Sequence, residues 1–420
     1  MIKLLCLGDA HLGRYPTRVP TNNPNFSVRA VWDTAISHAI EENVDAVILS
    51  GDMADNENSY FESFGALSSG ITRLKQSGIS VVAIAGNHDY DVFPELAKSM
   101  PAGHFKFLGK NGEWSEVTLN TNSGRSLRCV GWSFPTPHFE RSPLDSLKLA
   151  QSDSFTIGVV HGEYEGSGKY APLAKQDLAS KPVDFWLLGH VHTPKLYDKS
   201  RAPVLYPGSP QPLDPGEPGV HGPWMIIINE NNEVKAKQLP LASIHYEEIP
   251  IDLSGIEETE SAYRAVAEQL EKFAKQLTQN RPLLQHLSCR LALQGQTSLH
   301  RRLSTEGLTN IDTFETQINE CMIAIEKVSI QTSPTRDLQE IAQLNNDPPG
   351  MLARWILNLE TTDDHALVDC ASGAASVVYR SAGFKALSEP KPDPDILLGM
   401  AKQQAMLLLD ELLAQKEDHD

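Results

Sequence analysis

Short apolar runs alternate with amphipathic stretches through the first 200 residues of the chain. The runs lie at Ile2–Leu7, Ala46–Ser50, Val81–Ala85, Leu127–Val130, Thr156–Val160 and Phe185–Leu188. A short, uninterrupted apolar run is typical of a strand that is buried on both faces. Helices are predicted between these strands at Val28–Glu42 and Phe61–Gln76. With further strands at Val204–Tyr206 and Met225–Ile228, the pattern predicts an α/β domain of two packed sheets with helices outside them.

The pattern changes near Pro240 and again after Thr332. Between these points a helical stripe over Tyr263–Leu277 precedes a period-two alternation over Leu287–Leu293, which predicts a small α+β module. Beyond Thr332 the chain is mostly helical, and its last predicted helix, Asp395–Gln415, is expected to gather apolar residues on one side. These residues are Ile396, Leu397, Met400, Leu407, Leu408 and Leu412. The pattern therefore divides the chain into residues 1–245, 246–332 and 333–420.

Five short polar motifs occur where apolar strands end. They are Asp9-Ala-His11, Gly51-Asp52, Gly86-Asn87-His88-Asp89, His161-Gly162 and Gly189-His190-Val191-His192. The carboxyl ends of strands in an open α/β sheet border a crevice that binds ligands, so these side chains are expected to converge. Residues two apart on extended backbone point the same way, so each Asp-X-His or His-X-His pair can address one metal centre. The predicted metal ligands are Asp9, His11, Asp52, Asn87, His161, His190 and His192.

This mixture of carboxylate, amide oxygen and imidazole suits Mn²⁺, Fe or Zn²⁺. Two such ions about 3.5–4 Å apart can stabilise an in-line phosphoryl displacement, and solvent that bridges them becomes the nucleophile. The leaving oxygen needs a proton or a positive charge, and His88 is the nearby imidazole outside the ligand set that is expected to supply it. Asp89 is expected to set the tautomer of His88. Each motif alone has an ordinary interpretation as a turn, a cap or a core histidine; their ordered repetition after apolar strands favours the metal site.

Charge and cysteine content restrict the possible partners and compartment. The formal net charge of −18 argues against a chain that binds nucleic acid alone, because phosphate contacts need clustered Lys and Arg. Either the substrate is small or a partner supplies the basic surface. Five cysteines without paired spacing indicate a reducing compartment, and no run is apolar enough for a membrane helix, so a cytoplasmic protein is expected. The N-terminal residues are interpreted as a core strand and not as a signal peptide.

The ordered motifs resemble those of the calcineurin-like metallophosphoesterases, whose pattern is Asp-X-His, Gly-Asp, Gly-Asn-His-(Asp or Glu), His and Gly-His-X-His. The resemblance implies a four-layer α-β-β-α sandwich with a two-metal site. One ion would be held by Asp9, His11, Asp52 and His192. The other would be held by Asp52, Asn87, His161 and His190, so that Asp52 bridges the two.

A narrower resemblance lies in Tyr206-Pro-Gly-Ser-Pro-Gln-Pro-Leu213, Gly216-Glu217 and Gly222. Together with the opening Gly-Asp-Ala-His-Leu-Gly, these residues are similar to SbcD-type DNA-repair exonucleases, the nuclease subunits of complexes with SMC-like coiled-coil ATPases. This resemblance implies two Mn²⁺ ions, a DNA substrate, an SbcC-type ATPase partner and a homodimer. It also implies a capping domain at residues 246–332 and an ATPase-binding helical segment within 333–420. Asp55 departs from the pattern, because some relatives carry there a histidine that acts on the DNA backbone.

Three functions remain open on the sequence. A DNA exonuclease or endonuclease explains the long C-terminal extension, whereas a phosphatase or phosphodiesterase for small-molecule or protein esters fits the acidic charge better. A scaffold with an inactive site disagrees with the intact ligand set. The C-terminal helices either pack within the chain or present apolar anchors to a partner. The segment Arg14–Asn25, rich in Pro, Thr and Asn, is either a substrate loop or a plain surface loop.

Overall fold

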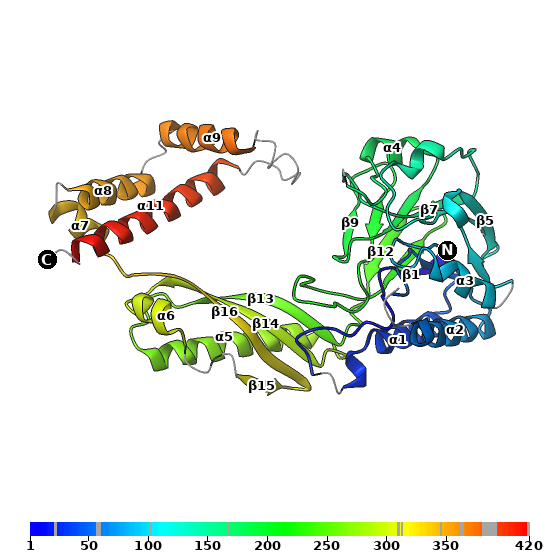
Figure 1. Cartoon of the computed structure of the whole chain (residues 1–420), viewed down its shortest axis with the longest axis horizontal. Helices are drawn as coiled ribbons and strands as arrows, with labels where there is room; N and C mark the ends of the chain where they lie inside the picture. Colours follow the sequence, from blue (N-terminus) through cyan, green and yellow to red (C-terminus); the bar gives the residue numbers. More distant parts are fainter. Residues whose placement is uncertain are drawn as a thin grey trace. The chain divides into compact units, whose positions relative to one another are not determined.

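Two six-stranded sheets form the N-terminal domain (Figure 1). The computed structural model describes residues 1–20, 23–55, 60–100, 103–166, 168–308, 311, 314–344, 347–361, 365–379 and 393–417. The first sheet contains, in order, β12 (Val234–Gln238), β11 (Trp224–Ile228), β1 (Ile2–Leu7), β2 (Ala46–Leu49), β3 (Ser80–Ala83) and β4 (Phe105–Phe107). The second contains β5 (Ser115–Asn120), β6 (Ser126–Trp132), β7 (Phe155–His161), β8 (Phe185–Gly189), β10 (Val204–Tyr206) and β9 (Lys195–Tyr197).

The central strands of both sheets are parallel. In the first sheet β1 to β4 run parallel and β11 joins β1 antiparallel, with Leu4 paired to Ile226. In the second sheet β6, β7, β8 and β10 run parallel, and β5 and β9 close the two edges antiparallel. Because parallel neighbours end at the same edge, the loops after β1, β2 and β3 emerge together, as do those after β7 and β8.

Each central strand is buried on both faces. On β1, Leu4 and Cys6 point into the core between the two sheets, while Leu5 and Leu7 point into the layer beneath the outer helices. This two-residue alternation follows from the pleat, and both sets are apolar because both faces are covered. The uninterrupted apolar runs in the sequence have this origin.

Helices cover the outer faces and complete four layers. α1 (Val28–Glu41), α2 (Tyr60–Gln76) and α3 (Val92–Ser99) pack on the first sheet, and α4 (Lys175–Ser180) packs on the second. The Ser27 side chain caps α1 by accepting a hydrogen bond from the Ala30 N–H. α1 and α2 lie side by side, joined by a 3.0 Å bond from Trp32 Nε1 to the Ala66 carbonyl (Figure 1). The predicted α-β-β-α sandwich is confirmed. Three 3₁₀ turns, Pro24–Phe26, Lys110–Gly112 and Pro143–Ser146, lie in its loops.

A third, four-stranded sheet follows. Its order is β13 (Ile244–Asp252), β14 (His286–Gln296), β16 (Cys321–Ser333) and β15 (Glu315–Ile318). α5 (Thr259–Gln279) connects β13 to β14, and α6 (His300–Glu306) follows β14. The segment therefore has the α+β composition that its sequence pattern predicts.

The C-terminal region is helical, as predicted, but the last helix buries a different face. The helices are α7 (Leu338–Leu344), α8 (Pro348–Thr361), α9 (His365–Tyr379) and α11 (Pro394–Glu417). α11 packs on α8 through Ala405, Met406 and Leu409. Four of the residues expected on its apolar side are about half exposed, namely Ile396, Met400, Leu407 and Leu408. The apolar side named from the sequence is thus left largely uncovered, because α11 carries apolar residues around much of its circumference and contact with α8 buries Ala405, Met406 and Leu409.

Contacts divide the chain into two compact units. The first comprises Met1–Ile249, Leu270–Arg290 and Ile311–Lys327, and the second Pro250–Gln269, Leu291–Asn310 and Val328–Asp420. The three sequence-based segments stay a prediction. Among the described helices, none combines the length and apolar character needed to span a membrane.

Candidate metal centre

Loops at the carboxyl ends of five strands carry the predicted ligands. Asp9 and His11 follow β1, Asp52 follows β2, Asn87 follows β3, His161 ends β7, and His190 and His192 follow β8. Four of these residues have a positive φ, a conformation that non-glycine residues rarely adopt: Asp9 (49°), His11 (45°), Asp52 (48°) and His190 (100°). Such strained backbone concentrates at functional sites, where surrounding structure holds it in place.

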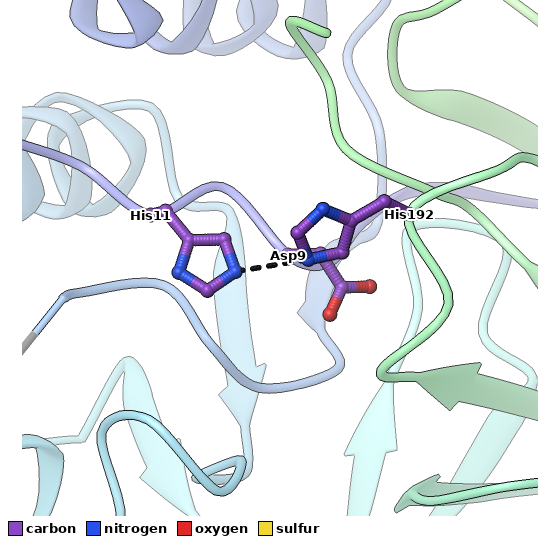
Figure 2. Close-up of side chains that lie close together, drawn as sticks. All are labelled: Asp9, His11 and His192. Carbon is purple, nitrogen blue, oxygen red and sulfur yellow. Dashed lines mark hydrogen bonds between the residues drawn. The ribbon is translucent and has the colours of Figure 1, made fainter. Parts of the chain in front are cut away.

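The first ligand group consists of Asp9, His11 and His192. Their ligand atoms lie within 4.8 Å of one another, and Nε2 of His11 is 3.1 Å from Nε2 of His192 (Figure 2). Two nitrogens bound to one cation at about 2.1 Å and at right angles would be roughly 3 Å apart. Asp9 Oδ1 accepts a 2.8 Å hydrogen bond from the His190 N–H, while its buried Oδ2 has no hydrogen-bond partner among the described residues. The orphaned oxygen and the facing imidazoles fit a bound cation.

The second group consists of Asp52, Asn87, His161 and His190. Asn87 Oδ1 lies 3.0 Å from His161 Nε2 and 3.1 Å from His190 Nδ1, and Asp52 Oδ2 lies 3.2 Å from His161 Nε2. Asp52 also clusters with Asp9 and His161 within 4.8 Å. Asp52 therefore lies where the two groups adjoin, at the position required of a bridging ligand.

The buried charges favour a cation at this centre. Burial raises the pKa of Asp9 to about 6 and lowers the pKa of both His11 and His190 to about 3. Burial also opposes charge on Asp52 and His161, but their mutual attraction and hydrogen bond lower the pKa of Asp52 and raise that of His161 to about 9. Neutral imidazoles and an ionised carboxylate are the protonation states that bind a metal, so cation binding is expected to displace the proton between Asp52 and His161.

His88 lies beside these groups with its ring partly open to solvent. Its side chain is 43% exposed, and its ring centroid is 5.0 Å from that of His11. Asp55 Oδ1 lies 3.8 Å from His88 Nδ1. Asp55 in turn forms an ion pair with Arg14. Arg14 is the first residue of the segment Arg14–Asn25, for which the sequence allowed either a substrate loop or a plain surface loop.

Asp89 does not contact His88 in the described structure, so the expectation that it sets the His88 tautomer is wrong. Its buried carboxylate accepts hydrogen bonds from the Gly86 N–H at 2.7 Å, the Met53 N–H at 2.8 Å and the Ala54 N–H at 3.3 Å. The carboxylate turns inward because these amides, on its own loop and on the loop after β2, would otherwise lack acceptors. Asp89 thus ties two ligand-bearing loops together.

The sequence did not predict the residues that contact the predicted ligand His192 through its Nδ1 nitrogen. Glu217 Oε1 lies 2.6 Å from His192 Nδ1, and Ser209 donates a 2.7 Å hydrogen bond to Glu217 Oε2. His221, one of the histidines given no role at the sequence level, lies buried against Ser209. In the sequence, only the resemblance of the loop Tyr206–Glu217 to SbcD-type exonucleases pointed to this region. That resemblance gave Ser209, Glu217 and His221 no role at the metal centre.

Comparison with known proteins agrees with the fold of the N-terminal domain. Residues 2–194 match a family model described as calcineurin-like phosphoesterase, and residues 246–333 match one described as the middle domain of the metallophosphoesterase YhaO. The N-terminal domain therefore belongs to the calcineurin-like metallophosphoesterase superfamily, whose members use a dinuclear metal site.

Three curated relatives give the range of similarity. A Bacillus subtilis protein named uncharacterized metallophosphoesterase YhaO is 24% identical over 57% of this chain and 59% of that protein. The DNA double-strand break repair protein Mre11 of Haloferax volcanii is 24% identical over 64% of this chain and 58% of that protein. Mre11 of Sulfurisphaera tokodaii is 33% identical over 50% of this chain and 54% of that protein. The chain thus spans less than two thirds of the length of these relatives. Among solved structures, a dimetal phosphatase from Danio rerio covers 56% of this chain and 98% of its own, with 12% identity and a TM-score of 0.36.

Proposed function

We propose that this protein is a metal-dependent phosphoesterase that hydrolyses phosphodiester bonds in DNA, as an exonuclease or endonuclease, with Mn²⁺ as its metal. The observation that carries the proposal is the convergence of seven ligand candidates into two groups that adjoin at Asp52. The choice of DNA is supported by the relatives named as DNA double-strand break repair proteins. The mixed oxygen and imidazole donors suit Mn²⁺, Fe or Zn²⁺, and the resemblance to SbcD-type exonucleases supports the choice of Mn²⁺ among them.

Each ligand group would hold one of the two metal ions. One ion would be held by Asp9, His11, Asp52 and His192, and the other by Asp52, Asn87, His161 and His190. Bound cations would supply an activated solvent nucleophile and neutralise charge on the phosphoryl oxygens. His88, outside both groups and partly exposed, would give a proton to the leaving oxygen, and Asp55 Oδ1 lies 3.8 Å from its Nδ1.

Cleavage of end-labelled linear DNA tests this proposal. We expect Mn²⁺-dependent cleavage by the unmodified protein, a loss of roughly 100-fold or more in His88→Ala, and no cleavage in Asp52→Asn. Glu233→Gln, at an exposed carboxylate on the turn after β11, is the control and should retain full activity. Purified protein that carries two Mn²⁺ ions yet cleaves no DNA, alone or with an ATPase partner, would refute the DNA assignment.

The net charge of −18 favours a second candidate, a phosphatase or phosphodiesterase for small-molecule or protein esters. An acidic surface repels a DNA backbone but poses less of a barrier to a small ester at a dication site. The same assay plate with p-nitrophenyl phosphate, bis-p-nitrophenyl phosphate and a phosphopeptide separates the two. Rapid turnover of one of these esters together with inertness towards DNA would select this candidate.

An SMC-like coiled-coil ATPase of the SbcC type is proposed as the partner that supplies the missing basic surface. The support is an apolar groove between α8 and α11. It is lined by Pro348, Met351, Leu352, Trp355, Ala401, Gln404, Ala405, Leu408 and Leu412. Met351 is 62% exposed and Leu408 49% exposed, which is unusual for large apolar side chains unless a partner covers them.

Co-purification with an SbcC-type coiled-coil ATPase tests the partner. Leu408→Glu should weaken the complex, because it places a charge in the apolar groove, whereas Glu411→Gln on the same helix should not. Equal recovery of the complex with both variants would contradict docking at this groove. A homodimer belongs to the same proposal, and analytical ultracentrifugation of the chain without its partner measures it directly.

A further inference from the structure

Glu217 is a buried carboxylate whose two oxygens are both engaged. It lies in the loop between β10 and β11 and is 7% exposed. Oε1 lies 2.6 Å from His192 Nδ1. Oε2 accepts hydrogen bonds from the Ser209 hydroxyl at 2.7 Å and from the Leu213 N–H at 2.9 Å. With both oxygens held, the carboxylate has little freedom to rotate away from His192.

This contact decides which nitrogen of His192 faces the metal centre. An ionised carboxylate only accepts hydrogen bonds, so the proton of the imidazole must sit on Nδ1. The lone pair is then on Nε2, which lies 3.1 Å from His11 Nε2 in the group formed with Asp9 (Figure 2). His161 is held in the same way by a neutral acceptor, since its Nδ1 is 3.0 Å from the Ser50 carbonyl.

The Ser209 hydroxyl, which donates to Glu217, is in turn fixed by His221. His221 Nδ1 lies 2.8 Å from the Ser209 carbonyl and 3.1 Å from its Oγ, so it acts as donor to Ser209. The Ser209 hydroxyl is then free to donate to Glu217. Ser209 and His221 are 1% and 2% exposed, so water does not compete for these bonds.

We propose that Glu217 is a positioning residue that presents Nε2 of His192 to one of the two metal ions, and that Ser209 orients Glu217 for this task. The inference rests on the proposed function only in requiring that the centre binds metal. Partners of this kind, which bond to the second nitrogen of a ligating histidine, typically change metal affinity about 10–100-fold when removed. The loop Ser209–Glu217, which carries none of the seven predicted ligands, thereby acquires a defined role at the centre.

Titration of the metal-free protein with MnCl₂ by isothermal calorimetry tests the proposal. Glu217→Gln is expected to weaken one of the two sites about 10–100-fold and to leave the other unchanged. Ser209→Ala, which removes one hydroxyl and leaves Glu217 in place, should weaken the same site by a smaller factor. Glu233→Gln is the matched control and should bind both ions like the unmodified protein. Urea unfolding in EDTA, measured on each variant, separates metal affinity from folding.

Two results would overturn the proposal. One is a Glu217→Gln protein that binds both ions with unmodified affinity. The other is equal weakening of both sites together with a loss of stability in EDTA, which is what a purely structural carboxylate would produce. If Glu217→Gln does not fold, Ser209→Ala decides: selective weakening supports the proposal and unchanged binding refutes it. Because the readout is metal affinity, a protein that binds two ions but cleaves no DNA would refute the nuclease assignment alone.

Discussion

Replacement of Asp89 by alanine tests whether this carboxylate holds two metal-binding loops together. Its buried side chain accepts hydrogen bonds from the backbone N–H groups of Gly86, Met53 and Ala54, the last of them long at 3.3 Å. A buried donor left without an acceptor costs about 1–3 kcal/mol. Counting only the two short bonds, Asp89→Ala should lower the free energy of unfolding by about 2–6 kcal/mol. That is a large part of the roughly 5–15 kcal/mol typical of a folded protein.

Urea unfolding in EDTA measures this loss without the stabilisation that bound metal adds to the native state. Asp89→Asn keeps the volume and one acceptor oxygen, so it should lose about half as much. Asp153→Ala, at an exposed carboxylate, is the control and should change the free energy by less than about 0.5 kcal/mol. An Asp89→Ala protein with unchanged stability but little activity would refute the tethering argument and return Asp89 to a role at His88.

Three further predictions concern Gly86, His286 and Asp55. Gly86→Ala should abolish Mn²⁺ binding, because its Cβ would lie 2.2 Å from Asp52 Oδ1; an unchanged calorimetric titration would contradict this. His286→Leu should make the protein less sensitive to acid. Burial lowers the pKa of His286 from 6.5 to about 4. The buried neutral ring therefore leaves the free energy of unfolding at its full value above pH 6.5, and this contribution is lost as the pH falls towards 4. Unfolding at about pH 7.5 and pH 5 should show roughly 2 kcal/mol more loss in the unmodified protein than in the variant, and equal losses would disprove it. Asp55→Asn should reduce turnover about 10-fold, because the negative charge beside His88 is removed; unchanged turnover would exclude that role.

Most of the sandwich could be predicted from the apolar runs. β1 and β10 have the predicted bounds, and the other six predicted strands of the two large sheets agree within two residues at each end. Burial on both faces explains this, because it leaves a continuous apolar segment with polar residues at each end. The strands that the pattern misses, β4, β5, β9 and β12, lie at sheet edges and, apart from the buried Leu119 of β5, carry half-buried or exposed residues. With one side open to solvent, their composition resembles that of loops.

The amino-acid sequence by itself determined which chemical groups can meet at the centre. Each ligand candidate follows an apolar strand, and parallel pairing brings such strand ends to one edge of each sheet. Packing of the two sheets then brings the two edges together. Tertiary structure decided the contacts between loops: Asp89 turned to backbone amides, Asp55 took the place beside His88, and Glu217 reached His192 from another loop. Spacing along one strand sets the direction of a side chain, whereas a bond between loops depends on how separate strands pair and how sharply each chain turns after them.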